Sequence, residues 1–233
     1  MKRFTTLPIL LVSFILLAAT HANAAKGGGA SGAGNFFLEE TFVPVIKTSN
    51  DTTSFTTAPG VATESGSGFD FRTTLGYTLG GEFLVGLTYN NYSYSSKRSA
   101  ISGGDDGSDI KTTKTEYGPT VGYLSNGWRV LFTYFLSGTK QVDTKNIDSS
   151  GATVGDGTIK NTSGTGMQFS FGYTFALGAH FEIGPSLVYR SMTYPKQSKV
   201  NRLNSSEDYT DTELYTKNTE SDLSPMITMQ FRF

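Results

Sequence analysis

The chain has 233 residues with 19 basic and 20 acidic side chains, a formal net charge of -1, and 13% aromatic residues. Basic and acidic residues are almost equal in number, so the chain has no excess of positive charge that could neutralise phosphates. We therefore expect no nucleic-acid partner. The absence of cysteine excludes a disulfide scaffold and thiolate chemistry.

The first 24 residues, MKRFTTLPILLVSFILLAATHANA, have the three parts of a secretory signal peptide. Lys2 and Arg3 form the charged head, an apolar run covers 7–19, and a small-x-small triplet ends at Ala24. The apolar run is shorter than the ~20 residues that a transmembrane helix requires. We therefore expect a signal peptide over 1–24, a short Gly/Ala-rich segment over 25–35, and a single domain over 36–233.

The mature chain contains eight segments in which apolar and polar side chains alternate with the period of a β-strand. They are FFLEETFVPVIKT, SGFDFRTTLGYTL, EFLVGLTYNNYSYSS, TEYGPTVGYL, WRVLFTYFLSG, MQFSFGYTFAL, FEIGPSLVYR and LSPMITMQFRF. The sixth shows the alternation most clearly, because Phe169, Phe171 and Tyr173 share one face while Ser170 and Gly172 share the other. No comparable helical pattern follows residue 24.

The connections between these segments alternate between short and long. Tight turns are expected near 80–81, 125–127 and 178–179, and long polar segments cover 49–67, 97–111, 141–160 and 196–212. Short periplasmic turns and long outer loops are typical of outer-membrane β-barrels. The sequence therefore predicts an all-β fold: an eight-stranded antiparallel transmembrane barrel of up-and-down topology, with four long extracellular loops, in the outer membrane of a Gram-negative bacterium.

A soluble lipocalin-like barrel is the main alternative, because its strands also alternate. Its apolar face would point inward, and its water-facing side would be rich in Lys, Glu and Asp. In this chain the polar face is mostly Gly, Ser and Thr, which suits the narrow interior of an eight-stranded barrel. The aromatic residues should therefore face lipid in two girdles, an inner one of Tyr77, Phe83, Tyr123, Trp128, Phe175 and Phe181 and an outer one of Phe69, Tyr89, Tyr117 and Tyr189.

The last segment ends on Phe233, with Ile227, Met229 and Phe231 on the same face. This ending resembles the terminal signal of bacterial outer-membrane proteins, which their assembly machinery reads. Together with the signal peptide and the uneven loops, it makes the chain similar in layout to the small eight-stranded outer-membrane barrels. That class includes OmpX-like, OmpW-like and opacity-type proteins and the barrel domain of OmpA. The resemblance implies outer-membrane lipid, lipopolysaccharide and the assembly machinery as partners, and we expect a monomer.

Four prolines fall inside expected strands, where each removes one N–H donor from the ladder. They are Pro44, Pro119, Pro185 and Pro225. The motifs YGPTVGY and IGPSLVY repeat one Gly-Pro placement. The repeat indicates either a bend in the fourth and seventh strands or a tolerated irregularity.

Eight charged residues share the inward-facing side of the strands and form two groups. Glu82, Arg129, Glu182 and Arg232 lie near the tight turns, whereas Asp70, Arg72, Glu116 and Arg190 lie roughly seven to ten residues higher. Each group has two acids and two bases, and breaking a buried pair costs about 3–5 kcal/mol. We therefore predict two layers of ion pairs that plug the lumen. The alternative is that some of these side chains reach the rims instead.

Three functions are compatible with such a barrel. The sequence favours a structural or surface-interaction role, in which the loops contact envelope partners, extracellular ligands or a host surface. A narrow transporter for small or hydrophobic solutes is the second, since Leu131, Phe135, Val188 and Met192 face inward. A barrel enzyme that modifies lipid A is the third.

The sequence predicts no catalytic, cofactor-binding or metal site. A serine hydrolase would need a base beside its nucleophile, and His180, the only histidine after residue 24, lies at an expected tight turn. In GGDDGSD, Asp105, Asp106 and Asp109 do not match the spacing of an EF-hand loop. A solvated acidic loop is the expected structure there.

Overall fold

The computed structural model describes residues 35–53, 60–80, 82–99, 107–148, 150, 152–202, 208–214 and 218–233. The expected signal peptide, nearly all of the Gly/Ala-rich segment, and Asp105 and Asp106 therefore lie outside the described residues. Within the described ranges, no helix is long and apolar enough to cross a membrane.

The regular elements of the described residues are all β-strands. They are β1 (Asn35–Thr53), β2 (Gly60–Leu79), β3 (Phe83–Arg98), β4 (Gly107–Ser125), β5 (Trp128–Phe135), β6 (Ser137–Ile147), β7 (Thr153–Thr162), β8 (Thr165–Tyr173), β9 (Phe175–Ala176), β10 (Phe181–Tyr194), β11 (Lys196–Arg202), β12 (Asp208–Leu214) and β13 (Asn218–Arg232).

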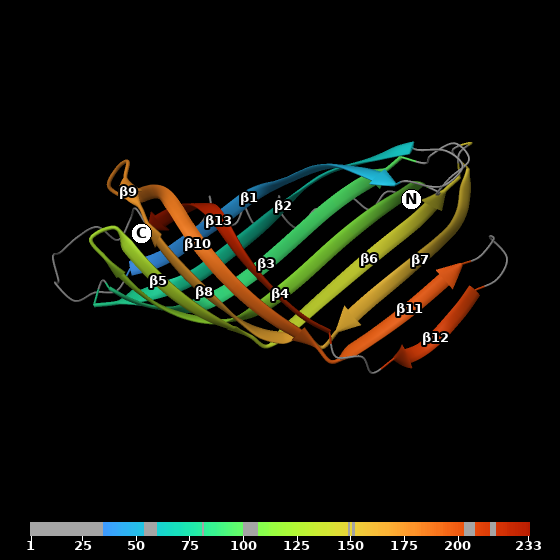
Figure 1. Ribbon diagram of the computed structural model, residues 1–233. Helices are drawn as coiled ribbons and strands as arrows, with labels where there is room; N and C mark the ends of the chain where they lie inside the picture. The colour runs from blue at the N-terminus through green and yellow to red at the C-terminus, as the bar shows by residue number, and fades with distance from the viewer. Residues whose placement is uncertain are drawn as a thin grey trace.

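Eight of these strands close into a barrel (Figure 1). Antiparallel pairing runs around the ring in the order β1-β2-β3-β4-β5-β8-β10-β13, and β13 returns to β1. Between β13 and β1, Arg232 pairs with Phe37 and Ile227 pairs with Phe42. The eight-stranded up-and-down barrel predicted from the alternation is therefore confirmed, and the last strand has a partner on both sides.

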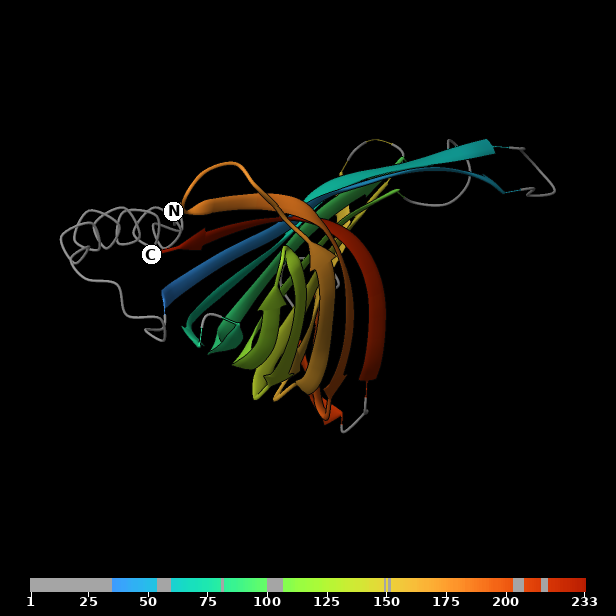
Figure 2. The same ribbon diagram turned by 90° about the vertical axis from the view of Figure 1, so that its left-hand side faces the viewer.

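The strands continue beyond the ring as an open sheet, where the sequence predicted loops (Figure 2). Its order is β1-β2-β3-β4-β6-β7-β11-β12, in which β6, β7 and β11 prolong β5, β8 and β10. The β3–β4 pairing extends to Arg98 and Ser108, and the β6–β7 pairing extends to Ile147 and Thr153. The described parts of the predicted loops over 97–111, 141–160, 49–67 and 196–212 are therefore largely paired strands. Polar composition suggested loops because both faces of this sheet are polar.

The barrel wall separates large outward side chains from small or paired inward ones. Tyr77, Phe83, Trp128, Phe69 and Tyr117, all expected in the girdles, are among the exposed large hydrophobic residues. Inside, a Cβ atom on Gly118 would collide with the backbone carbonyl oxygen of Tyr134. Glycine at this position therefore allows the close approach of two strands.

At Pro119 and Pro185, the side of the backbone where another residue would carry its N–H faces an interruption in the neighbouring strand. Hydrogen-bonding direction alternates along a strand. Because Leu136 donates its N–H to the Tyr117 carbonyl at 3.1 Å, Pro119 faces the junction of β5 and β6, where the register with β4 shifts by one residue. Pro185 similarly lies opposite the end of β8, where the N–H of Thr174 instead donates to Gly127 at 2.8 Å. The Gly-Pro repeat thus coincides with two breaks in the wall.

Candidate functional site

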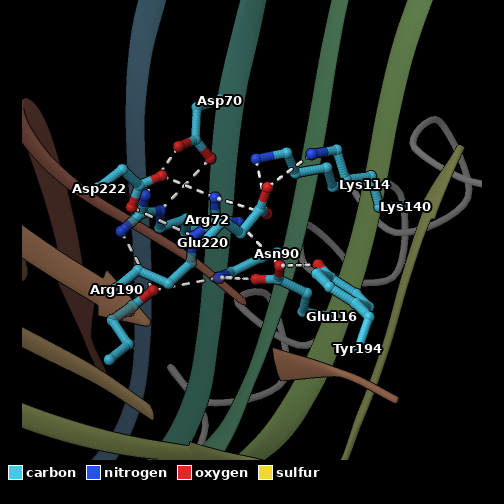
Figure 3. A network of polar contacts seen from close by, with 11 residues as sticks. Asp70, Arg72, Asn90, Lys114, Glu116, Lys140, Arg190, Tyr194, Glu220 and Asp222 are labelled. Atoms are coloured by element: carbon cyan, nitrogen blue, oxygen red, sulfur yellow. Dashed lines mark hydrogen bonds and ion pairs between the residues drawn. The ribbon is translucent and has the colours of Figure 1, made fainter. Parts of the chain in front are cut away.

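Inward-facing polar side chains in the upper half of the barrel form a continuous network (Figure 3). The residues come from β2, β3, β4, β6, β10 and β13, and the figure labels Asp70, Arg72, Asn90, Lys114, Glu116, Lys140, Arg190, Tyr194, Glu220 and Asp222. Four acids and four bases take part, so the network is balanced in charge.

Arg190 on β10 lies at the centre of this network. Its Nη1 donates to Oε1 of Glu116 at 2.8 Å, and its Nε and Nη2 donate to the two oxygens of Asp222 at 3.2 and 2.6 Å. The Tyr194 hydroxyl donates to the same Glu116 oxygen at 3.0 Å. Arg190 is 3% exposed and Glu116 is fully buried, so these charge-assisted bonds offset the cost of removing the ions from water.

Arg72 forms the second centre of the network. Its Nη2 lies 2.7 Å from Oδ2 of Asp70, two residues away on the same face of β2, and its Nη1 donates to Oε1 of Gln168 at 3.1 Å. Nδ2 of Asn90 donates to Gln168 at 3.1 Å and to Glu116 at 3.2 Å. Asn90 therefore connects the two arginine centres.

Glu220 lies above these centres and binds two lysines. The Nζ of Lys114 is 2.8 Å from one carboxylate oxygen, and the Nζ of Lys140 is 2.7 Å from the other. All three residues lie beyond the outer girdle that Tyr117 marks on β4. Burial alone would raise the pKa of Glu220, but the two ammonium groups lower it below its ordinary value. The carboxylate is therefore ionised at neutral pH.

A second buried ion pair lies near the periplasmic end. Arg129, which is 1% exposed, pairs through Nη2 with Glu39 and donates from Nη1 to the Thr228 hydroxyl at 3.0 Å. Nε2 of Gln230 donates to the other oxygen of Glu39 at 2.9 Å. Both charges of this pair therefore have additional hydrogen-bond partners.

Threonine hydroxyls fill the barrel between the two ionic groups. Thr74 contacts Thr88 at 2.8 Å, Thr88 contacts Thr120 at 2.5 Å, and Thr120 contacts Thr133 at 2.7 Å. These four side chains come from β2, β3, β4 and β5 and are all buried. Small hydroxyl side chains therefore line the lumen along half of the wall.

The structure places the eight predicted lumen charges in four settings. Asp70, Arg72, Glu116 and Arg190 join the upper network, whereas Glu182 and Arg232 pair with each other at 3.3 Å and are only partly buried. Arg129 instead pairs with Glu39. Glu82 is exposed and accepts hydrogen bonds from Tyr123 at 2.9 Å and Ser125 at 3.1 Å. It leaves the expected layer because β3 begins at Phe83, so Glu82 belongs to the turn.

Sequence reasoning missed five charged residues of the lumen: Glu39, Lys114, Lys140, Glu220 and Asp222. A signal for Glu39 was present, since Phe37, Glu39 and Thr41 alternate in the first segment. The other four were missed because they lie just beyond the assumed ends of the strands.

The remaining candidate residues lie outside the lumen. The ring of Phe231 packs on Phe181 at 4.9 Å and that of Phe233 lies 6.1 Å from Phe36. Ile227 and Met229 belong to the same terminal strand, and recognition of this strand by the assembly machinery stays a prediction. Nδ1 of the exposed His180 contacts the Arg232 carbonyl at 2.8 Å.

Asp109 lies on β4, where it pairs with Lys97 at 3.7 Å. In the part of the chain that the structure describes, no group of three or more His, Asp or Glu side chains is placed to hold a metal ion.

Comparison with known proteins identifies the type of fold. No protein-family profile and no curated protein matches the chain. Among solved structures, a major outer membrane protein from Thermus thermophilus is similar over 86% of this chain and 100% of its own, with 12% identity and a TM-score of 0.54. OprG from Pseudomonas aeruginosa covers 88% of this chain and 98% of its own at 12% identity and a TM-score of 0.40. Ail of Yersinia pestis covers 88% and 100% at 11% identity and a TM-score of 0.36.

The chain has the fold of a bacterial outer-membrane β-barrel. Only helices and closed barrels satisfy their backbone groups within hydrocarbon, and the outward band of exposed apolar residues on this barrel requires lipid around it. The predicted outer-membrane location is therefore confirmed. The resemblance to small eight-stranded barrels is confirmed as well, at the level of fold.

Proposed function

We propose that the protein is a structural and surface-interaction barrel of the bacterial outer membrane whose lumen is plugged by ion pairs. The observation that carries this proposal is the Arg190 network, which ties β10 to β4, three strands away around the ring, and to β13. An eight-stranded barrel has room inside for side chains but not for a water channel. Buried, paired charges in that space stabilise the wall and leave no path for ions.

The packing of the apolar lumen residues favours this plug over a transporter. Leu131 belongs to a buried cluster with Phe37 and Leu84 near the periplasmic end, whereas Phe135 and Met192 cluster at the upper end. Thr133 lies between Leu131 and Phe135 along β5 and takes part in the threonine contacts. An apolar path through the lumen would require these two clusters to be in contact with each other.

The open sheet outside the ring is the surface that we propose for contact with partners. Lys97, Asp109, Lys145 and Asp156 are directly opposite one another on four successive strands. Directly opposed opposite charges stabilise an exposed sheet. They also line part of a hollow of about 670 Å³. Such an alternating surface suits polar partners of mixed charge, such as lipopolysaccharide head groups or an extracellular ligand.

Planar-bilayer recordings test the plug. The purified barrel, shown to be folded by its heat-modifiable migration in SDS gels, should give no steady conductance, because charged and hydroxyl side chains occupy the lumen. A sixteen-stranded porin inserted under the same conditions provides the positive control. Steady ohmic conductance from the wild-type barrel would overturn the plug and promote the transporter.

A further inference from the structure

The wall of the barrel is incomplete between its first and last strands. β1 pairs with β2 through nineteen residue pairs, from Asn35–Thr78 to Thr53–Gly60, but with β13 through only six. Beyond Phe42 and Ile227, the described part of β1 pairs with β2 alone and that of β13 with β10 alone. Figures 1 and 2 show that the two strands diverge from this point.

Two prolines lie where the pairing stops. Phe233 donates its N–H to the Phe36 carbonyl at 3.0 Å, so even-numbered residues of β1 and odd-numbered residues of β13 direct their backbone groups across this seam. Continuing the register places Pro44 opposite Pro225, at a position where each would donate to the other. Neither has an N–H to donate.

The same prolines leave the adjoining ladders intact. Pro44 remains paired with Phe69 on β2, and Pro225 remains paired with Leu187 on β10. Their effect is thus confined to the seam, where two hydrogen bonds are lost at one level. The seam therefore ends at a position that the sequence specifies.

The split begins inside the lipid-facing band. Two residues beyond the prolines, Ile46 on β1 and Leu223 on β13 point outward and are 79% and 62% exposed. Tyr189 of the outer girdle pairs with Leu223. The edges of the split therefore meet the outer leaflet, where an unpaired backbone amide must bind another polar group.

The inward-facing side chains at the start of the split are apolar, whereas the inward-facing positions farther along β13 are polar. Val43 and Val45 on β1 share the inward face of Glu39 and Thr41, and the inward-facing Met226 on β13 is buried. We infer that the split between β1 and β13 is a lateral opening through which an acyl chain of an outer-leaflet lipid reaches the upper lumen. The chain would lie against these apolar side chains while its ester carbonyls accept hydrogen bonds from unpaired amides of the edges. This inference requires no pore and does not depend on the plug.

Tryptophan quenching in vesicles with brominated acyl chains tests the lipid contact. The chain has a single tryptophan, so reporters are introduced into a Trp128→Phe background. Val45, Gly68 and Tyr94 are register partners across three strands, which makes Val45→Trp and Tyr94→Trp inward-facing reporters at corresponding positions of the wall. Val45→Trp, beside the split, should lose as much fluorescence as the lipid-facing Ile46→Trp, and Tyr94→Trp should lose far less. Equal quenching of Val45→Trp and Tyr94→Trp in folded barrels would overturn the opening.

Disulfide trapping tests the split independently of any lipid. The chain lacks cysteine, so each introduced pair is unique. Phe42→Cys with Ile227→Cys, the last paired level, should cross-link under oxidation because paired strands hold Cα atoms within disulfide range. Val45→Cys with Ser224→Cys, the pair that a continued register would make, should not. Rapid cross-linking of the second pair would show a closed seam and overturn the proposal.

Discussion

The guanidinium of Arg129 is almost completely buried, so the free energy of its charge depends on the groups around it. Glu39 supplies the opposite charge, and Thr228 and Gln230 satisfy further hydrogen-bonding positions of the pair. Removing one partner of such a pair leaves an uncompensated charge in a low-dielectric interior. The penalty comes from the charge that remains, more than from the lost contact itself.

Glu39→Gln should therefore destabilise the barrel by about 3–5 kcal/mol. The measurement is the temperature at which the folded form disappears from SDS gels. Glu182→Gln is the matched control, because its partner Arg232 lies near the rim and is 28% exposed. Pairs of that kind contribute about 0–1 kcal/mol. Equal losses in the two variants would contradict the buried role of Glu39.

The contrast between Glu39 and Glu82 shows how far sequence reasoning reaches at this scale. Alternation identified the inward face correctly for Arg129, Arg190 and Glu116, because one parity rule applies along a whole strand. It failed at Glu82, where the strand had not yet begun. Partners depend on strand stagger around the ring, a property of the closed barrel that no single strand specifies.

At the scale of the strand, the four prolines share one rule. At each proline, the backbone position that lacks an N–H faces a junction or the open seam and not a continuous ladder. The sequence showed that a hydrogen-bond donor is absent at Pro44, Pro119, Pro185 and Pro225. It did not show which neighbouring strand the position of that donor faces. That direction depends on which neighbour each residue faces in the alternating pattern.

Restoring the two donors at the seam should extend the pairing of β1 with β13. Pro44→Val combined with Pro225→Val returns two N–H groups, each opposite the carbonyl oxygen of the other residue, and a net hydrogen bond contributes about 0.5–1.5 kcal/mol. The double variant should unfold at a higher temperature and show slower hydrogen exchange in β13. Pro119→Val, whose N–H would face the β5–β6 junction, should give no gain. A double variant with unchanged exchange would contradict the assigned direction of these donors.

At the scale of the whole molecule, the barrel and the outer sheet form one continuous structure. Residues 141–160, which look like a loop by composition, pair from Lys140–Asn161 to Ile147–Thr153. Period-two apolar patterning disappears there because neither face meets lipid or a packed core. Secondary structure outside the membrane therefore could not be predicted from hydrophobicity, although the same strands could be predicted within it.

Trypsin applied to intact cells distinguishes a sheet from loops. Lys140 and Lys160 lie in paired strands, and a protease requires an extended, unpaired segment at its cleavage site, so both should resist cutting while the barrel is folded. The same enzyme should cut at both residues after heat denaturation, which serves as the control for accessibility of the bonds. Mass analysis of the released peptides identifies the sites. Fast cleavage after Lys140 or Lys160 in intact cells would mean that this sheet does not persist at the cell surface, and the proposed interaction surface would be lost with it.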